Sequence, residues 1–261
     1  MLDDNRHLFP HIFRVLPQSA STNGEAVDAI QRGEKPGNGA VYLTHHQSAG
    51  RGQGTNTWHA TPHQNLTLSI VCYPTHLPLA HLFSLSQATA LAVAATVRCF
   101  LPPKHRTRVR AKWPNDVYVG DRKIAGVLIQ NGLRGQDLAW SVVGIGLNVN
   151  EMDWPASLKN TAVSLRELTE VELDLELVQK TLFEEFAKHY GLLEARLRAS
   201  LDRHYHAALY RLDERSEFVH VATGRRFIGV IRGVTQAGHL RVEDVAYGRE
   251  VAFDLREIKL Y

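Results

Sequence analysis

Val117-Tyr-Val-Gly-Asp-Arg-Lys-Ile-Ala-Gly-Val-Leu-Ile-Gln130 sets the architecture of this chain, because two apolar runs flank the dipeptide Gly120-Asp121. Glycine and aspartate are typical of a tight hairpin turn, which predicts that the two runs pair as strands. A second turn at 132–137 leads into a third run at 138–149. Strands joined by such short turns must be antiparallel. The middle of the chain is therefore predicted to be an antiparallel sheet.

More strands and a helix precede this centre. Strands are predicted at 11–16, 40–47, 65–73 and 109–113. Residues 19–25 offer several N-cap candidates for a helix at 26–30. In the strand at 65–73, Leu66, Leu68 and Ile70 alternate with polar neighbours, which predicts one buried face. Apolar residues spaced three or four apart at 79–101 predict an amphipathic helix that ends at Pro102-Pro103.

Residues beyond 150 are predicted to be mainly helical and then to return to strands. A short helix is expected at 164–168 and another at 204–209. Between them lies a longer helix with an apolar stripe, which is expected to be core: Leu175, Val178, Leu182, Phe186, Tyr190, Leu193 and Leu197. Short runs at 216–221, 227–231, 239–242, 250–255 and 258–260 predict a small β-barrel or sandwich. The expected domains are therefore 1–211 and 212–261.

Composition narrows the class of protein. The 261 residues are 44% hydrophobic and 22% charged, as in ordinary globular proteins. The net charge of +3 is too mild to indicate nucleic acid as the main ligand, although it suits an acidic or phosphorylated one. No run approaches the ~20 apolar residues that span a bilayer, and the polar N-terminus lacks signal-peptide order, so a cytoplasmic location and no membrane partner are expected. Cys72 and Cys99 are expected to be buried thiols without a disulfide.

A glycine-rich stretch, Gln47-Ser-Ala-Gly-Arg-Gly-Gln-Gly-Thr-Asn-Thr-Trp58, is a candidate anion site. Its three closely spaced glycines can expose backbone N–H groups to a ligand, and the guanidinium of Arg51 matches a carboxylate or phosphate. The structural alternative is a mobile surface hairpin with one solvated arginine, which is the commoner explanation for a lone stretch of this kind. Other chemistry in the chain must support the anion site.

Three further motifs supply such chemistry: Lys112-Trp-Pro-Asn-Asp116, Arg122-Lys-Ile-Ala-Gly126 and Gly144-Ile-Gly-Leu-Asn148. Each alone has a structural explanation, as a turn or as a glycine bulge in a strand. Together they place two lysines, an aspartate and open backbone near the central strands. The combination indicates one ligand site.

With Ser21-Thr-Asn23, these motifs occur in an order and at spacings that resemble the biotin protein ligases over almost the whole chain. The resemblance implies an α+β fold of the class II synthetase-like kind. That fold has a mixed, largely antiparallel sheet with helices packed on one face and a C-terminal SH3-like β-barrel. It also implies a two-step reaction. Biotin and ATP form biotinyl-5′-AMP and pyrophosphate, and biotin then passes to one lysine of a biotin carrier protein.

The resemblance also assigns roles to residues. Lys123 and Arg51 are expected to neutralise the biotin carboxylate and the α-phosphate, with Lys112 beside the nucleotide and Mg²⁺ carried with ATP rather than held at a protein metal site. Asp116 either deprotonates the acceptor lysine or orders the basic residues, and both roles stay open. The expected biotin site comprises Ser21, Thr22, Asn23, Gln47, Gly50, Arg51, Gly52, Gln53, Lys123, Gly126 and Gly146. The expected nucleotide site comprises Arg51, Trp58, Lys112, Asn115, Lys123 and Asn148.

Two departures from the family pattern stand out. Gln53 and Gly54-Thr-Asn56 occupy positions where many members carry further arginines, so the loop has a weaker electrostatic hold on the adenylate unless Asn56 or Trp58 compensates. A tenfold change in retention corresponds to only about 1.4 kcal/mol. The Ser21 motif begins so early that a helix-turn-helix domain is not expected, nor is a nucleic-acid partner. The loop is expected to act as a lid, and either a monomer or a homodimer is compatible with the sequence.

Three other functions are alternatives to biotin ligation. A lipoate ligase or octanoyl transferase shares the fold, but the Gln47 and Lys112 motifs favour biotin. A binding module built on the terminal barrel leaves the central cations unexplained. A metal site from His45, His46, His59 and His63, or from His204 and His206, lacks zinc-type spacing. A basic cluster of Arg106, Arg108 and Arg110 is either a solvated strand edge or a contact for an acidic carrier.

Overall fold

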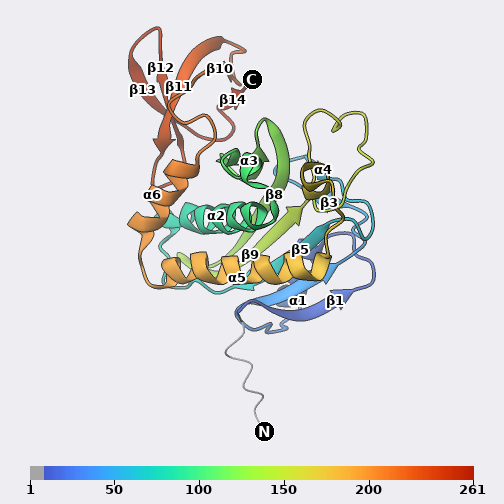
Figure 1. Ribbon diagram of the computed structural model, residues 1–261. Coiled ribbons are helices and arrows are strands. Elements are labelled where there is room, and N and C mark those ends of the chain that lie inside the picture. Colours follow the sequence, from blue (N-terminus) through green and yellow to red (C-terminus); the bar gives the residue numbers. More distant parts are fainter. Residues whose placement is uncertain (1–8) are drawn as a thin grey trace.

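A computed structural model describes residues 9–261 and contains a seven-stranded sheet in the order β1-β2-β5-β9-β8-β7-β6 (Figure 1). Strands β1 and β2 are parallel, whereas every other neighbouring pair is antiparallel. The predicted mixed, largely antiparallel sheet is confirmed. The strands are β1 (His11–Leu16), β2 (Ala40–Thr44), β5 (Leu66–Cys72), β6 (Val109–Lys112), β7 (Asp116–Val119), β8 (Arg122–Arg134) and β9 (Asp137–Leu147).

Helices cover both faces of this sheet. The main core forms where one face meets α2 (Phe83–Phe100), α5 (Leu175–Glu194) and α6 (Arg198–Ala208). On the other face, α1 (Thr22–Gln31) packs Ala26 and Ala29 against Tyr42, Val71 and Val142. The prediction of helices packed on one face is therefore confirmed for α2, α5 and α6, and the structure adds α1 on the opposite face. Two shorter helices are α3 (Pro103–Arg106) and α4 (Leu165–Thr169).

Helix α2 packs against the sheet, α5 and α6, which explains its composition (Figure 1 shows α2 beside α5). Most of its residues are buried, because a helix enclosed on several sides needs no polar face. The segment Leu79–Phe100 is long and apolar enough to cross a membrane, so the expectation that no such run exists was wrong. Since 67% of its most apolar window is buried within the protein, it serves as a core helix. Cys99, near its end, is exposed, so the expectation of two buried thiols holds only for Cys72, whose pKa is raised by burial.

Strand β5 is buried on both faces, not on one as its alternating pattern predicted. Leu66, Leu68 and Ile70 face the main core. The intervening Thr67 and Ser69 are also buried, and each makes a hydrogen bond: the hydroxyl of Thr67 donates to the carbonyl of Thr44 (2.7 Å). The polar face of β5 is therefore turned toward the inside of the protein and not toward bulk solvent. Its hydroxyl groups can line an internal site.

A separate five-stranded antiparallel sheet ends the chain, in the order β13-β12-β11-β10-β14 (top left in Figure 1). The five predicted strands are confirmed, and the sheet fits the expected SH3-like module. It contacts the main sheet through Trp113, whose Nε1 donates to the carbonyl of Gly238 (2.7 Å). The boundary at 212 stays a prediction. The strands are β10 (Arg215–His220), β11 (Arg226–Val234), β12 (Leu240–Asp244), β13 (Arg249–Phe253) and β14 (Ile258–Leu260).

The apolar stripe on α5 forms part of the main core. Most of the stripe is buried as predicted, but Leu197 lies beyond the helix and is 51% exposed. Phe186 is fully buried and stacks with Phe9 and Tyr190 at centroid distances of 5.9 and 5.7 Å.

We predict that Phe186→Ala lowers the free energy of unfolding by about 3–5 kcal/mol, because it leaves a cavity between stacked rings. Leu177→Ala on the same helix removes a side chain that is 53% exposed and should change stability by no more than about 0.5 kcal/mol. Urea unfolding of both variants measures the difference. Equal losses would contradict the assignment of this stripe to the core.

Candidate functional site

A cavity of about 290 Å³ lies over β5, β8 and β9, on the sheet face that α1 covers. This volume is near the lower end of the range for small-molecule pockets. Four separate parts of the chain form its walls: the start of α1, the loop at 47–58, the segment 112–116, and residues of the C-terminal sheet. The four motifs that the sequence singled out and the Ser21 motif therefore meet at one place.

Polar side chains from the start of α1 form one end of the cavity. Ser21, one of the N-cap candidates at 19–25, caps the helix, which begins at Thr22. The backbone N–H of Thr22 donates to the side-chain carbonyl of Gln47 (3.0 Å). Ser69 donates to the side-chain oxygen of Asn23 (2.6 Å), and the Asn23 amide donates to a backbone carbonyl of β8 (3.0 Å). These contacts hold hydroxyl and amide groups in fixed orientations.

Two glycines form the floor of the cavity. Gly126 of β8 and Gly146 of β9 stand opposite each other in register. A Cβ added at Gly146 would overlap the indole of Trp58, and one added at Gly126 would lie 3.2 Å from the same ring. The predicted open slot is therefore a flat surface of bare backbone that Trp58 borders, and a side chain at either position would close it. A side chain is also excluded at Gly144, because an added Cβ would lie 2.6 Å from Asn23 Oδ1.

Four cations line the cavity, Arg51, Lys112, Lys123 and Lys259, and the three that the sequence predicted differ in how they are held. Lys123 Nζ lies 2.6 Å from Asp116 Oδ1 and 5.6 Å from the centre of the Trp58 ring. Lys112 Nζ donates to the hydroxyl of Tyr118 (3.1 Å). Burial lowers the pKa of Lys112, and the nearby Asp116 carboxylate partly opposes that shift. Arg51 is exposed and forms no ion pair within residues 9–261.

The loop at 47–58 is a surface hairpin and also contributes to the cavity wall, so it has features of both structures that its sequence allowed. It forms a hairpin of β3 (Gly50–Arg51) and β4 (Thr57–Trp58), with Gly54 at φ 66° in the turn. This is the surface hairpin of the structural alternative. The same hairpin also places Arg51 in the cavity wall. Its expected behaviour as a lid stays a prediction.

Most of the predicted site residues line the cavity, and two do not. Gly50 pairs with Trp58, and a Cβ there would lie 2.6 Å from the Trp58 carbonyl oxygen, so it shapes the hairpin. Asn148 is buried, and its amide donates to the carbonyl of Val163 (3.1 Å), so it fixes the segment beside β8. The predicted residues in the wall are Ser21, Thr22, Asn23, Gln47, Arg51, Gly52, Gln53, Trp58, Lys112, Asn115, Asp116, Lys123, Gly126 and Gly146.

Comparison with known proteins assigns this site to a family. Residues 16–148, which are just over half of the chain, match the Biotin/lipoate A/B protein ligase family. The chain belongs to this family. The resemblance predicted from its motifs is confirmed.

Individual relatives of this ligase-family protein carry names that refer to biotin. It is 28% identical over 88% of its length to the "Bifunctional ligase/repressor BirA" of Escherichia coli, of which the match covers 68%. It is 29% identical over 87% of its length to the "Biotin--[acetyl-CoA-carboxylase] ligase" of Mycobacterium tuberculosis, of which the match covers 81%. The BirA of Bacillus spizizenii is matched over only 46% of its own length, so the chain spans about half of that relative.

Solved structures confirm the fold of this family member. The biotin protein ligase from Aquifex aeolicus in complex with biotin and ATP superposes with a TM-score of 0.77 at 20% identity, covering 97% of this chain and 99% of that one. A biotin protein ligase from Leishmania major in complex with biotinyl-5-AMP gives a TM-score of 0.61. At such identities the likeness establishes the architecture, including its C-terminal sheet.

Several wall residues of the ligase-family site were not predicted. Thr67 and Ser69 line the cavity, and their alternation with leucines in β5 was the available signal. Tyr210 lies in the wall with its ring centre 5.7 Å from Lys112 Nζ, and no motif marks it. The C-terminal sheet adds mainly apolar residues from short strands without any motif: Ile231, Leu240, Leu255, Ile258, Lys259 and Leu260.

The histidines considered as metal ligands have other neighbours. His45 and His63 stack with ring centres 5.6 Å apart. His206 Nε2 accepts a hydrogen bond from the backbone N–H of Val234 (2.8 Å). Across residues 9–261 no group of three or more His, Cys, Asp or Glu side chains is arranged to hold a metal ion.

We predict that Gly146→Ala displaces the Trp58 indole from the cavity floor, since the new methyl group would occupy its space. Acrylamide quenching of Trp58 fluorescence, taken as the difference between each protein and its Trp58→Phe counterpart, should increase. Gly191→Ala is the control: its Cβ meets nothing within 4 Å in α5, and it should stabilise the helix by about 0.5–1 kcal/mol without changing the quenching. Unchanged quenching in Gly146→Ala would contradict the contact.

Proposed function

We propose that this protein is a biotin protein ligase, which activates biotin with ATP to biotinyl-5′-AMP and transfers biotin to a lysine of a carrier protein. One observation carries the proposal. A single cavity brings together fixed polar groups, a flat glycine floor and the cations Arg51, Lys112 and Lys123. These are the parts needed to hold a polar ring, an apolar ring and tail, and a carboxylate beside a phosphate.

Biotin is favoured over lipoate by the polar end of the cavity. The ureido group of biotin has two N–H donors and a carbonyl acceptor, which match fixed hydroxyl and amide groups such as those of Thr22, Asn23 and Ser69. The dithiolane ring of lipoate has none of these groups. Because buried polar groups left unpaired are costly, a site of this kind discriminates against a ligand that cannot hydrogen-bond.

The first step joins two negatively charged groups. A carboxylate oxygen of biotin attacks the α-phosphorus of ATP, the bond to the bridging oxygen breaks, and pyrophosphate leaves with Mg²⁺. In this proposal Lys123 and Arg51 neutralise the approaching carboxylate and α-phosphate, and Lys112 lies beside the nucleotide. Lys123 is paired with Asp116 before substrate enters, which supports a role for Asp116 in ordering Lys123.

The second step forms an amide. The neutral ε-amine of the acceptor lysine attacks the biotinyl carbonyl, the bond to the phosphate oxygen breaks, and AMP leaves. The loop has Arg51 as its single cation, so Gln53, Asn56 and Trp58, which all line the cavity, are proposed to hold the adenylate with hydrogen bonds and ring contact. A cytoplasmic carrier protein is the proposed macromolecular partner.

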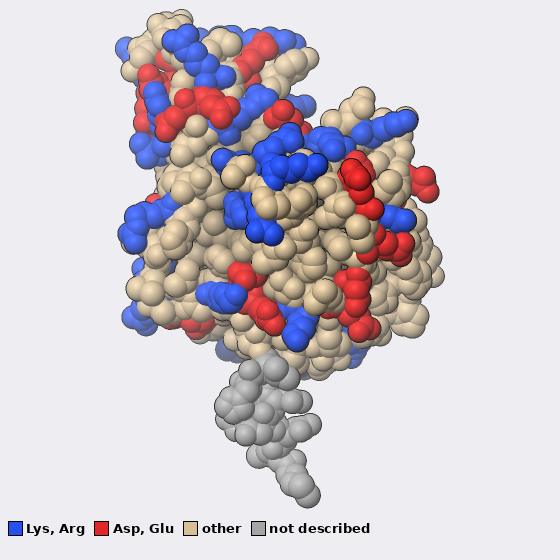
Figure 2. Space-filling model, viewed as in Figure 1, with Lys and Arg blue, Asp and Glu red and all other residues tan. Residues whose placement is uncertain are grey.

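A basic surface beside the C-terminal sheet supports a protein partner. Figure 2 shows lysine and arginine side chains gathered over α3, which contains Lys104 and Arg106. Within residues 9–261 neither side chain forms an ion pair with a carboxylate, and Arg106 Nε donates to the carbonyl of Leu101 (2.7 Å). An acidic surface on a carrier would complement this patch.

The decisive test incubates the protein with ATP, Mg²⁺, labelled biotin and a biotin carrier domain. We expect label on the carrier, with lipoate and octanoate transferred at least about 10²-fold more slowly in matched reactions. Mass spectrometry of the carrier measures the product. Transfer of lipoate or octanoate without transfer of biotin would refute the proposal.

Lys123→Ala should reduce adenylate formation by about 10²–10³-fold, because it removes a cation fixed where negative charge must be neutralised. Pyrophosphate release in the absence of carrier measures this step. Arg122→Ala is the matched control, since Arg122 is the adjacent cation, pairs with Glu167 (2.8 Å) and does not line the cavity. Near-normal release by Lys123→Ala, or an equal loss in both variants, would remove Lys123 from this role.

A further inference from the structure

The two ends of the loop at 47–58 are fixed by different parts of the protein. At the incoming end, the backbone N–H groups of Ser48 and Ala49 donate to the carbonyls of Ser19 and Ala20 (2.9 and 3.0 Å). The loop strands pair only with each other, in two residue pairs. A hairpin this short has little stability of its own. Besides the packing of the Trp58 indole on Gly126 and Gly146, the outgoing strand is held by contacts that follow Trp58.

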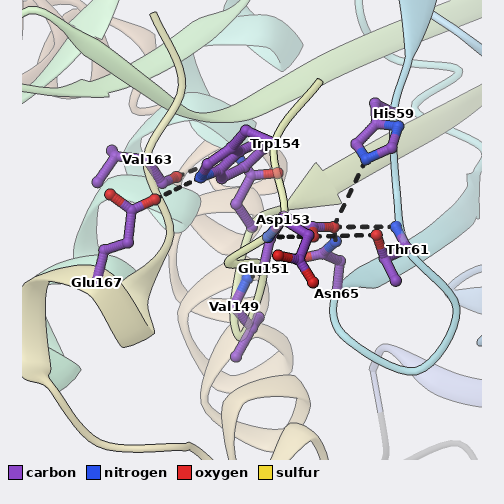
Figure 3. Close-up of polar contacts among 10 residues, drawn as sticks. His59, Thr61, Asn65, Val149, Glu151, Asp153, Trp154, Val163 and Glu167 are labelled. Carbon is purple, nitrogen blue, oxygen red and sulfur yellow. Dashed lines mark hydrogen bonds and ion pairs between the residues drawn. The ribbon is translucent and has the colours of Figure 1, made fainter. Parts of the chain in front are cut away.

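Several of those contacts are made to one buried carboxylate, Glu151 (Figure 3), and the backbone N–H of His63 also donates to the carbonyl of His45 (2.8 Å). The side chain of Glu151 is 1% exposed, and it lies just beyond the end of β9. Thr61 donates to it twice, from the backbone N–H and from the hydroxyl, both at 3.0 Å. The Asn65 amide donates at 2.9 Å and the backbone N–H of Asp153 at 3.3 Å. These four donors satisfy a charge that would be costly to bury alone.

Fixing Thr61 restricts Trp58, because only His59 and Ala60 separate them. Three residue steps span at most about 11 Å in a fully extended chain. His59 lies near the same carboxylate, with Nε2 at 3.9 Å from Glu151 Oε2. The indole that rests on Gly126 and Gly146 is therefore tethered, through a short segment, to Glu151.

The same region also reaches the strand that carries Lys123. The backbone N–H of Asp153 donates a hydrogen bond to Glu151, and the indole N–H of the next residue, Trp154, donates one to Glu167. Figure 3 shows this contact between Trp154 and Glu167. Glu167 accepts a second hydrogen bond from Arg122, which precedes Lys123. The segment 151–154 thus contacts the residues that follow Trp58 and, through Glu167, the strand that bears Lys123.

We propose that Glu151 is a positioning residue for biotin binding. By holding Thr61 it sets Trp58 over the glycine floor and so fixes the width of the slot that receives the rings and tail of biotin. This inference rests on the proposed function. Glu151 does not line the cavity, so it acts through the loop and not by touching substrate. Its loss should weaken biotin binding while leaving the rate of the chemical step nearly unchanged.

The main variant is Glu151→Gln, because an amide nitrogen cannot accept the hydrogen bonds that a carboxylate oxygen accepts. We expect the Kd for biotin by calorimetry and the KM for biotin to rise at least about tenfold, or about 1.4 kcal/mol, with kcat within about twofold of the wild type. Trypsin should also cleave after Arg51 faster than in the wild type, because the outgoing strand is no longer held.

Two variants at Thr61 keep the test decisive if Glu151→Gln fails to fold. Thr61→Ser retains both donors and should leave the KM for biotin unchanged, whereas Thr61→Val loses the hydroxyl and should raise it. If both single variants fold, the effects of Thr61→Val and Glu151→Gln should not add in the double variant, since they act on one contact. Equal KM values for the two Thr61 variants would overturn the proposal.

Asp244→Asn controls for general destabilisation. Asp244 is a buried carboxylate in the C-terminal sheet, outside the cavity wall, which accepts from Arg225 (2.9 Å) and from the backbone N–H of Ala246 (3.0 Å). It should leave the KM for biotin unchanged. A similar rise in both proteins, or wild-type biotin affinity in Glu151→Gln, would overturn the positioning role.

Failure of the proposed function gives a different result. A wild-type protein that binds no biotin by calorimetry would refute the ligase assignment. Tryptic cleavage after Arg51 requires no substrate and still tests the tether: faster cleavage in Glu151→Gln supports it, and unchanged cleavage overturns it.

Discussion

The contact between the Trp58 indole and the paired glycines of β8 and β9 is the constraint on which the site depends. Gly126 and Gly146 face each other across the two strands, and a side chain at Gly146 would exclude the ring. Bare backbone at this point lets an aromatic residue from a distant loop reach the sheet. The contact joins the loop to the centre of the fold, and the remaining walls are arranged around the surface that results.

The framework and the position of the site could be predicted from sequence, because both leave local signals. The turn at Gly120-Asp121 identifies antiparallel neighbours, and glycines and lysines at strand ends mark the site. What could not be predicted is what covers each surface. The alternation in β5 describes one face, while Thr67 and Ser69 become buried only because α1 and the cavity enclose the other. Similarly, Tyr210 and the C-terminal wall reach the cavity through tertiary packing, which leaves no periodic pattern.

Motif spacing in the sequence also assigns more residues to the site than the structure places in the cavity wall. Gly50 and Asn148 belong to motifs of which several members line the cavity, yet the first shapes the hairpin and the second binds the segment beside β8. A sequence motif includes residues that line the site and residues that only support it. The supporting residues include glycines at positions where a side chain would not fit and amides that hold neighbouring segments. Glu151 is the opposite case: it lies outside every motif, and only its four donors reveal its importance.

Charge is distributed unevenly between the rigid and movable parts of the site. Lys112 and Lys123 lie on sheet strands and have partners, Tyr118 and Asp116, that hold them before any ligand is present. Arg51 is the only cation between Gln47 and Trp58. Electrostatic stabilisation is most effective when the charges are already in place, so the sheet is the better location for the cations. The loop is then left with a mainly steric task, to set an aromatic wall over the glycine floor. That task requires its outgoing strand to be fixed from outside, and the buried carboxylate of Glu151 meets that requirement.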